Sequence, residues 1–255
     1  MTEPPTTGPP TTGPLTIVQQ PRVLRPAAPA AGEPAAGGAT VAVWDVDGTL
    51  TRLDTLLPFL TRVSGPARVA RSLAFSAGRG DAKAFVLHHL LGGRRTADVE
   101  VIGRRYAQHV VARRLRPDSL RRWRWHRELG HRMVIASASP DLYVRHLGAL
   151  LGADTVICTE MDAINGRLTG LMAGGNCRGA EKARRVLEHL VTLRANLVWA
   201  YADGTVDSPL LALADVPVRV RQHRRLYVMS QPAGAPSAGV PVIDRFAVDR
   251  PGRPR

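Results

Sequence analysis

Short, continuous runs of apolar residues recur along the chain, and segments with a helical spacing of apolar positions separate them. Runs of this kind are typical of strands that are buried on both faces of a parallel sheet. The alternation of strands and helices predicts an α/β fold with a parallel sheet. The expected strands cover about 39–45, 132–136, 155–158, 197–201 and 216–220.

Residues 55–128 interrupt this alternation, because they carry helical signals and no strand signal. Pro66 can begin one helix, and Asp81 can cap a second. Thr96 can cap a third helix, and Pro117 can begin a fourth. We therefore expect a four-helix cap that is inserted into the α/β core. The core is assigned to residues 39–54 and 129–247.

The two ends of the chain differ in composition from the core. Residues 1–38 are rich in Pro, Thr, Ala and Gly and show little hydrophobic periodicity, which predicts a disordered tail. Residues 248–255 are expected to form a flexible C-terminus, and residues 240–246 could add an edge strand. Within the core, Asn165-Gly166 between two short segments predicts a hairpin turn.

The composition is that of an ordinary globular protein, with 44% hydrophobic and 22% charged residues. No apolar run approaches the ~18 residues needed to span a bilayer, and no secretory signal is visible at the N-terminus. The chain has two cysteines, Cys158 and Cys177, so a disulfide framework is not expected. We therefore expect a reduced, cytoplasmic protein without a membrane segment.

The net charge of +14 is concentrated in the predicted cap, where 16 Lys and Arg residues stand against 5 Asp and Glu residues. A basic segment of this size raises the question of nucleic-acid binding. However, Lys83 and Lys182 are the only lysines among the 35 basic residues, a bias that indicates codon pressure. We expect a positive funnel for small anionic substrates rather than a nucleic-acid site.

Two aspartates follow the first expected strand in the stretch Asp45-Val46-Asp47-Gly48-Thr49. Open α/β sheets bind ligands at the carboxyl ends of their strands. Gly48 permits a sharp turn, and its lack of a side chain lets backbone amides approach an anion. By itself the stretch could also be an ordinary turn or part of a calcium loop, although the further oxygen ligands of a calcium loop do not follow.

Polar residues also end two other expected strands. Ser137 follows the second expected strand, and Asp203 and Asp207 follow the fourth. Lys182 lies in the first turn of a helix between them. Because strand ends converge on one edge of a doubly wound sheet, we expect these side chains to meet the two aspartates there.

Together these residues match the requirements of phosphomonoester hydrolysis through an aspartyl-phosphate. Asp45 would attack phosphorus, and Asp47 would protonate the leaving alkoxide and later accept a proton from water. The groups expected to hold Mg²⁺ are Asp45, Asp203, Asp207 and the backbone carbonyl of Asp47. The residues expected to hold the phosphoryl oxygens are Ser137, Lys182, Gly48 and Thr49.

Simpler structural roles compete with two of these assignments. A lysine that survives in an arginine-rich chain indicates a site that needs a compact ammonium. Lys182 could nevertheless have persisted by chance on a helix surface. Ser137 could merely cap the helix that follows it.

The order of these residues resembles the four motifs of the haloacid dehalogenase (HAD) superfamily. The motifs are Asp45 to Thr49, Ser137 after its strand, Lys182, and Asp203 with Asp207. A closer resemblance, to the phosphoserine-phosphatase-like branch called subfamily IB, lies in the helical segment between the first two motifs and in the stretches 49–55, 137–140 and 176–182. The resemblance covers about residues 39–247. It implies a Mg²⁺-dependent phosphatase with a Rossmann-like core and a mobile cap.

Four positions depart from the pattern of that branch. The fourth motif usually reads Gly-Asp-Ser-x-x-Asp, whereas Ala202 and Gly204 stand at its Gly and Ser positions here. Asp54 stands where phosphoserine phosphatase carries a substrate-reading Glu, and Val206 stands where it carries Asn. Phosphoserine is therefore not expected as the substrate. Asp54 and Lys83 are candidate substrate contacts, with a solvated surface role as the alternative for each.

We therefore expect a Mg²⁺-dependent phosphomonoester hydrolase, a phosphatase of the HAD-IB type, that acts on a small phosphorylated metabolite. The altered fourth motif leaves a second hypothesis, a binding or regulatory protein that keeps the fold with weakened catalysis. A phosphotransferase or mutase would use the same nucleophile, and a nucleic-acid binder would use the basic cap.

Overall fold

The computed structural model describes residues 38–78, 80–220 and 227–228, and a seven-stranded sheet with the order β4-β3-β2-β1-β5-β6-β7 forms its centre. Strands β4 and β7 lie at the edges and run antiparallel to their neighbours, whereas the five inner strands are parallel. The predicted α/β fold with a mainly parallel sheet is confirmed. The strands are β1 (Ala39–Trp44), β2 (Arg132–Pro140), β3 (Thr155–Ile164), β4 (Arg167–Ala173), β5 (Ala195–Ala202), β6 (Val216–Arg219) and β7 (Tyr227–Val228).

Three predictions concern segments near the two ends of the chain. The tail expected over residues 1–38 lies, except for Gly38, outside the described residues. The edge strand expected over residues 240–246 and the C-terminus at 248–255 also lie outside them.

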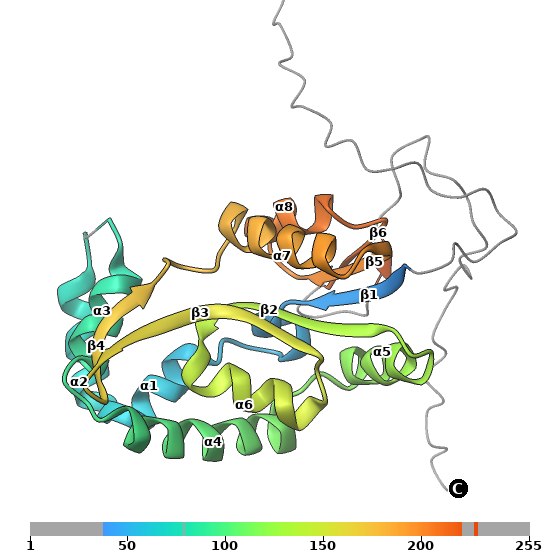
Figure 1. Ribbon diagram of the computed structural model, residues 1–255. Helices are drawn as coiled ribbons and strands as arrows, with labels where there is room; N and C mark the ends of the chain where they lie inside the picture. Colours follow the sequence, from blue (N-terminus) through green and yellow to red (C-terminus); the bar gives the residue numbers. More distant parts are fainter. Residues whose placement is uncertain (1–37, 79, 221–226, 229–255) are drawn as a thin grey trace, which may run out of the picture.

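Helices cover both faces of the sheet and give the molecule three layers (Figure 1). Helices α7 and α8 lie on one face, while α5 and α6 lie on the other, with α4 packed against α6. The helices are α1 (Leu56–Ser64), α2 (Pro66–Ser76), α3 (Ala82–Leu91), α4 (Thr96–Arg113), α5 (Pro117–Glu128), α6 (Asp141–Leu151), α7 (Ala180–Thr192) and α8 (Ser208–Ala212). Two short turns, η1 (Val46–Leu50) and η2 (Thr205–Asp207), follow β1 and β5.

The sequence of α7 shows why its inner face is buried. Ala183, Val186 and Leu190 recur every three or four positions and are buried, as the amphipathic pattern of a surface helix requires. Val186 and Leu190 join the apolar cluster on this side of the sheet. Across the described part of the chain, no helix combines the length and the apolar composition that a bilayer crossing requires.

Strand β1 is buried on both faces because it lies between β2 and β5 and under both helix layers. Val43 packs on the α7 side, and Trp44 packs on the opposite side. The Trp44 ring stacks on that of Tyr201 in β5 with centroids 3.7 Å apart, and the Tyr201 hydroxyl is hydrogen-bonded to the buried His126 at 2.7 Å. This packing fixes the end of β1, where the amide of Asp45 donates to the Tyr201 carbonyl at 3.0 Å.

The segment 55–128 contains five helices rather than the four that the sequence predicted. The unpredicted helix is α1, whose third residue is Pro58. A proline in the first turn removes no intrahelical hydrogen bond, so it does not prevent the helix. Helices α2 and α5 begin at Pro66 and Pro117, as predicted.

The two predicted side-chain caps have different outcomes. Asp81 caps α3, because its Oδ1 accepts a hydrogen bond from the Ala84 amide at 2.9 Å. Thr96 is instead the first residue of α4, and Arg95 occupies the cap position without a side-chain hydrogen bond. Arg95 pairs with Arg167 of β4 in an antiparallel bridge, which keeps its backbone extended and sets the helix start at the next residue.

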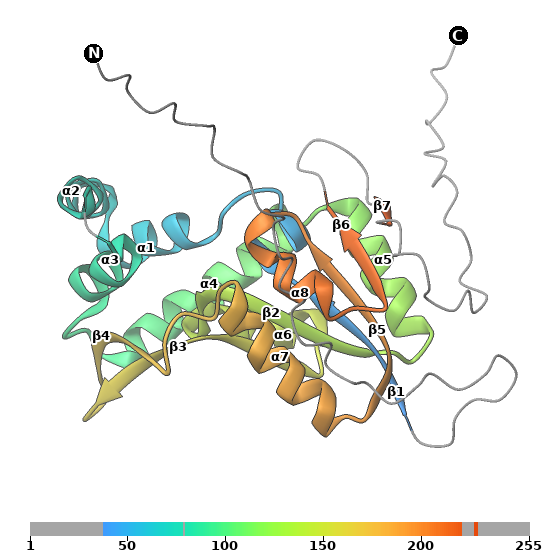
Figure 2. The same cartoon turned by 90° about the horizontal axis from the view of Figure 1, so that it is seen from above.

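Helices α1, α2 and α3 form a lobe at one end of the molecule, beside the β3–β4 hairpin (Figure 2). The linker before α1 lies beside the linker after α4. Thr51 pairs with Leu115 in an antiparallel bridge, and the Arg52 amide donates to the Arg114 carbonyl at 3.3 Å.

Helix α4 runs along the outer side of α6, and α5 lies beside the sheet, so neither belongs to the lobe (Figure 1). Gly103 allows α4 to approach α6 closely, since a Cβ at this position would lie 2.0 Å from the Leu142 carbonyl oxygen. Helix α5 contacts β2 and η1. The domain boundaries drawn at 55 and 128 stay a prediction.

Strands β2 and β3 extend beyond the apolar runs that predicted them. Strand β2 includes Ser137 and continues to Pro140, with a shift of its pairing to β3 between these two residues. Strand β3 continues to Ile164 and turns into β4 at the predicted hairpin. The positive φ values of Asn165 (52°) and Gly166 (72°) are those that a tight hairpin turn requires.

Candidate active site

The carboxyl ends of β1, β2 and β5 meet where the strand order reverses around β1. The chain adds β2 and β3 on one side of β1 and later adds β5 and β6 on the other. Open α/β sheets form a crevice at such a point. A cavity of about 600 Å³ lies here. Five residues that were predicted to act in catalysis or to hold the metal or phosphate line it: Asp45, Asp47, Lys182, Asp203 and Asp207.

Asp45, the predicted nucleophile, is buried, and both of its carboxylate oxygens are held in place. Lys182 Nζ donates to Oδ1 at 2.7 Å, and the Thr49 hydroxyl donates to Oδ2 at 3.0 Å. The same Nζ lies 2.9 Å from Oδ1 of Asp207. A single lysine from the start of α7 therefore holds carboxylates that follow two different strands.

The pKa values of Asp45 and Lys182 are both raised, but for different reasons. Burial raises the pKa of Asp45 to about 7; Lys182 opposes this shift, and Asp207 and Asp47 add to it. Burial also disfavours the charge on Lys182, but Asp45 and Asp207 outweigh it and raise the pKa of Lys182 above its ordinary value. The lysine is therefore a fixed cation near neutral pH.

An acidic cluster surrounds this lysine and offers ligands for a cation. One carboxylate oxygen from each of Asp45, Asp203 and Asp207 lies within 4.8 Å of the other two. Carboxylate oxygens at such spacing are the ligands that Mg²⁺ prefers in proteins. The repulsion that raises the pKa of Asp45 would be relieved by a bound cation. The donor set therefore fits a divalent metal ion.

Gly48 makes the close approach of Asp203 to the first turn possible. A Cβ at position 48 would lie 2.0 Å from Asp203 Oδ2. The backbone at Gly48 also has a φ of 83°, which L side chains rarely adopt. The turn after β1 thus requires glycine for two reasons.

Asp47 lies at the same cavity and receives hydrogen bonds from two distant segments. The Thr55 amide and hydroxyl donate to Oδ1 at 2.7 and 2.6 Å, and the Ser139 hydroxyl donates to Oδ2 at 2.7 Å. Burial raises the pKa of Asp47, although these hydrogen bonds oppose the shift. A raised pKa suits a carboxyl group that must protonate a leaving group near neutral pH.

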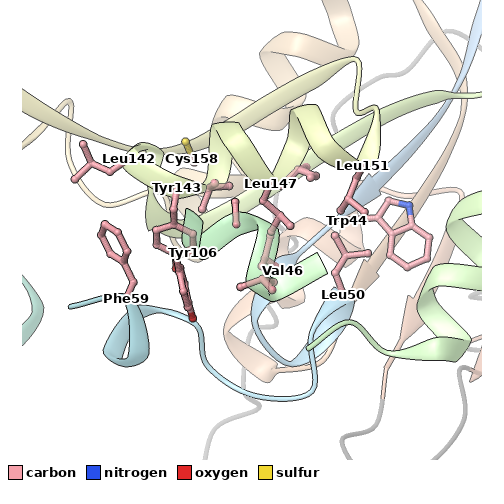
Figure 3. Packing of buried hydrophobic residues seen from close by; sticks show 14 of the residues in the cluster. Trp44, Val46, Leu50, Phe59, Tyr106, Leu142, Tyr143, Leu147, Leu151 and Cys158 are labelled. Atoms are coloured by element: carbon pink, nitrogen blue, oxygen red, sulfur yellow. The ribbon is translucent and has the colours of Figure 1, made fainter. Parts of the chain in front are cut away.

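Buried aromatic side chains fix the position of Thr55 in turn. The Tyr143 and Thr55 hydroxyls are hydrogen-bonded at 2.7 Å, and the Tyr106 hydroxyl donates to the Thr55 carbonyl at 2.8 Å. The Tyr143 ring packs against Phe59 and Tyr106, with centroids 4.7 and 5.3 Å away (Figure 3). Thr55 lies in the stretch 49–55, which carries the family resemblance, but the sequence pattern assigned no role to it.

Two residues that were predicted to hold phosphoryl oxygens, Ser137 and Thr49, are fully buried and do not belong to the cavity lining. Ser137 Oγ accepts a hydrogen bond from the Ser139 amide at 3.1 Å, and Thr49 holds Asp45. Ser139, which the sequence reasoning did not assign, lines the cavity instead. Phosphate contacts by Ser137, Thr49 and Gly48 stay predictions.

The two predicted substrate contacts, Asp54 and Lys83, both line the cavity. Asp54 Oδ2 accepts from the Leu57 amide at 2.9 Å and so holds the start of α1. Lys83 Nζ donates to the Ala138 carbonyl at 2.5 Å and to Oδ1 of Asn176 at 2.7 Å. The lysine therefore ties α3 of the lobe to two segments of the core.

Gly204, the altered position in the fourth motif, has room for a side chain. Its φ of −91° and ψ of 162° are open to any residue. The nearest atom to a Cβ built there is the Val206 amide nitrogen, at 3.9 Å. The departure from the family pattern therefore removes a hydroxyl without demanding a different backbone.

The chain is similar in sequence to proteins of a known family over most of its core. The family model of haloacid dehalogenase-like hydrolases matches residues 42–212. Protein CicA of Caulobacter vibrioides is 36% identical over 185 residues, which cover 69% of this chain and 83% of CicA. Phosphoserine phosphatase SerB1 of Mycobacterium tuberculosis is 24% identical over 161 residues, 62% of this chain and 51% of SerB1.

Solved structures share the fold. A protein of unknown function from Bordetella pertussis has a TM-score of 0.59 and 22% identity, over 69% of this chain and 87% of its own. A probable phosphoserine phosphatase from Vibrio cholerae has a TM-score of 0.53 and 18% identity, over 69% of this chain and 54% of its own. With the family model matched over most of the core, the chain belongs to the haloacid dehalogenase-like hydrolase family.

Proposed function

We propose that this protein is a Mg²⁺-dependent phosphomonoester hydrolase that forms an aspartyl-phosphate on Asp45 and acts on a small, soluble phosphate ester. The arrangement of the two aspartates carries this proposal. Asp45 is paired with a buried cation, Lys182, while Asp47 is held nearby in an environment that raises its pKa. Relatives that are named phosphoserine phosphatases support a phosphatase rather than another hydrolase.

In the first step, a carboxylate oxygen of Asp45 attacks phosphorus. The new Asp45 O–P bond forms as the bond from phosphorus to the leaving oxygen breaks. Asp47 gives its proton to that oxygen, so the leaving group departs as a neutral alcohol. Lys182 offsets negative charge beside the transferring phosphoryl group.

In the second step, water hydrolyses the aspartyl-phosphate. Asp47, now a carboxylate, accepts a proton from water as the water oxygen bonds to phosphorus. The Asp45 O–P bond breaks, which releases inorganic phosphate and restores the Asp45 carboxylate. Thr55 and Ser139 keep Asp47 oriented through both proton transfers.

The residues that would hold Mg²⁺ are Asp45, Asp203 and Asp207, with the backbone carbonyl of Asp47. When bound, the ion supplies positive charge that reduces the repulsion between an anionic nucleophile and an anionic phosphate ester. Lys182 keeps the nucleophile oriented toward the cavity through its contact with Asp45.

The proposal is tested by assaying the purified protein on a panel of phosphate esters, with Mg²⁺ and with a chelator. Asp45→Asn should lower turnover by about 10⁴-fold or more, because it removes the nucleophile. Asp98→Asn, at an exposed position in α4, is the matched control and should retain activity. The absence of turnover on any ester, or full turnover by Asp45→Asn, would contradict the proposal.

The second candidate is a binding protein with weakened catalysis, which the missing hydroxyl at Gly204 favours. Beryllofluoride mimics a phosphoryl group on aspartate and separates the two candidates. A Mg²⁺-dependent complex of beryllofluoride with the wild-type protein, absent in Asp45→Asn, would support the phosphatase. Ligand binding without such a complex and without turnover would support the binding protein.

A further inference from the structure

Two cations from different parts of the chain line the active-site cavity beside the aspartates. Lys83 extends from α3 of the lobe, and Arg178 belongs to the segment between β4 and α7. Neither takes part in any of the ion pairs found among the described residues. Their charges therefore remain for a molecule in the cavity.

The hydrogen bonds of Lys83 fix its position without neutralising its charge. Its acceptors are the Ala138 carbonyl and the Asn176 side-chain oxygen, both of which are uncharged groups. Thr159 holds these acceptors in turn, because its hydroxyl donates to the Ala138 carbonyl at 2.7 Å and contacts Asn176 Oδ1 at 3.2 Å. An ammonium has three donors, so one N–H of Lys83 remains for an occupant.

Asn176 links Lys83 to Arg178, because its side-chain oxygen accepts from Lys83 Nζ at 2.7 Å and its carbonyl accepts from the Arg178 amide at 2.7 Å. Burial lowers the pKa of Lys83 to about 8; Asp47 opposes this shift, and Arg178 adds to it. The lysine therefore stays mainly charged at neutral pH. An anion placed between the two cations would relieve their mutual repulsion.

We propose that Lys83 and Arg178 form an anion subsite that selects phosphate esters whose leaving group carries a second anionic group, such as a carboxylate or a second phosphate. This inference rests on the proposed phosphatase function. The same two cations repel an ammonium, so they disfavour amino-bearing leaving groups of otherwise similar shape.

Two acidic residues in the cavity lining, Asp54 and Asp81, could instead attract an ammonium. Both are exposed to water, which screens their charge as it does that of Arg178, so the main contribution to the subsite comes from Lys83. Both also hold helix starts, because Asp54 accepts from the Leu57 amide and Asp81 accepts from the Ala84 amide, each at 2.9 Å. Lys83 is half-buried, so water screens its charge less than it screens theirs.

Matched substrates measure the charge preference directly. 3-Phosphoglycerate and glycerol 3-phosphate differ in a carboxylate against a hydroxymethyl group, and 3-phosphoglycerate and O-phosphoserine differ in a hydroxyl against an ammonium. We expect the wild-type kcat/KM for 3-phosphoglycerate to exceed that of each partner by about tenfold or more. The difference should lie mainly in KM, because the subsite binds the ground state and the transition state alike.

Variants of the two cations show where the preference comes from. Lys83→Met should reduce the 3-phosphoglycerate to glycerol 3-phosphate ratio to within about twofold of one, and Arg178→Met should reduce it partly. Lys83→Arg keeps the charge and should keep the preference even where overall turnover falls. Arg71→Met, at an exposed position on α2 outside the cavity lining, is the control and should leave the ratio unchanged.

Binding to the Asp45→Asn variant gives a readout that does not depend on turnover. Calorimetry should show tighter binding of 3-phosphoglycerate than of glycerol 3-phosphate, and the added substitution Lys83→Met should remove the difference. Equal binding of the two esters, or a preference that survives Lys83→Met, would overturn the anion subsite. Failure of the phosphatase itself would show separately, as the absence of wild-type turnover on every ester while the binding difference persists.

Discussion

The cavity has two parts whose side chains are held in different ways. The floor consists of Asp45, Lys182, Asp203 and Asp207, which follow β1 and β5 or begin α7. Lys182 is buried between the carboxylates of Asp45 and Asp207, and an Asp203 oxygen lies within 4.8 Å of both of them. The wall consists of Asp54, Asp81 and Lys83 from the lobe, where the two aspartates hold the starts of their own helices.

This difference separates the reaction from the choice of substrate. A change in the floor leaves a buried charge without its partner, which is costly for both folding and chemistry. A change in the wall leaves the contacts of Lys182 with Asp45 and Asp207 intact, because no wall residue takes part in them. The floor is therefore suited to fix the chemistry, and the wall is suited to vary with the substrate.

After the loss of the nucleophile in Asp45→Asn, the largest expected effect comes from Gly48→Ala, which disrupts the floor. Its Cβ would lie 2.0 Å from Asp203 Oδ2, so Asp203 must move away from the acidic cluster. We expect phosphatase activity to fall by about 10²–10³-fold, because a misplacement of about 1 Å is enough for losses of this size. Steady-state kinetics over a range of Mg²⁺ concentrations should also show a higher Mg²⁺ requirement.

Gly130→Ala is the control, because it introduces the same backbone strain as Gly48→Ala without a clash like that with Asp203. Gly130 has a φ of 70°, and no atom lies within 4 Å of a Cβ built there. Backbone strain should lower the free energy of unfolding of Gly130→Ala by about 1–2 kcal/mol, as it does in Gly48→Ala. The activity of Gly130→Ala should stay unchanged. Equal loss of activity in the two variants would refute the contact between Gly48 and Asp203 as the cause.

A smaller effect is expected at Thr55, which holds Asp47 beside the floor. Thr55→Val removes the hydroxyl that donates to Asp47 Oδ1 at 2.6 Å, and kcat should fall about tenfold. Burial raises the pKa of Asp47 and the hydrogen bond from the Thr55 hydroxyl opposes this shift, so its loss raises the pKa further, while the backbone amide of residue 55 still donates. Because Asp47 acts in its protonated form in the first step, the fall of kcat at alkaline pH should move to higher pH.

Thr61→Val is the matched control for this change. The Thr61 hydroxyl donates to the Leu57 carbonyl of its own helix at 2.8 Å and is exposed. Its loss should leave both kcat and the pH profile unchanged. A pH profile that does not move in Thr55→Val would show that Thr55 does not position the acid.

The wall is tested by the pH dependence of the charge preference, where a several-fold effect is expected. The groups that influence Lys83 are Asp47, Asp81, Cys177 and Arg178. Burial lowers the pKa of Lys83 to about 8, so its positive charge is present below that pH and is lost above it. The kcat/KM ratio of 3-phosphoglycerate to glycerol 3-phosphate should therefore decline as the pH rises through about 8.

Lys83→Arg provides the comparison, because an arginine does not lose its proton in this range. The ratio should then stay constant up to pH 10. A wild-type ratio that is independent of pH would assign the preference to another cation.

The smallest expected effect concerns Gly204, which lies beside the floor without contributing a side chain to it. Gly204→Ser should stabilise the protein by about 0.4–1 kcal/mol, because it restricts the unfolded chain and fits the native backbone. For a chain of this size the Tm should rise by about 1–4 °C in a thermal scan. A lower Tm would show that the space around Gly204 is not open to a side chain.

The floor could be predicted from the sequence, because each of its residues follows an apolar strand or begins a helix in a recognisable pattern. The convergence of strand ends in an α/β sheet then brings Asp45, Lys182 and Asp203 together. The strand order reverses around β1, and these three side chains line one cavity there.

The partners of Asp47 could not be predicted in the same way. Thr55 and Ser139 reach it through the path of a linker and the irregular end of β2, which depend on tertiary packing. The pairing of β2 with β3 shifts after Ser137, and the sequence pattern does not signal this shift. As a result, Ser139 rather than Ser137 lines the cavity.

The two linkers of the helical region have a consequence for how such proteins diversify. The bridge between Thr51 and Leu115 places the start and the end of the intervening segment side by side. A segment with adjacent ends can be lengthened, trimmed or exchanged without redirecting the strands that it interrupts. Changes in this insertion alter the wall of the cavity, while Asp45, Lys182, Asp203 and Asp207 keep their places at the edge of the sheet.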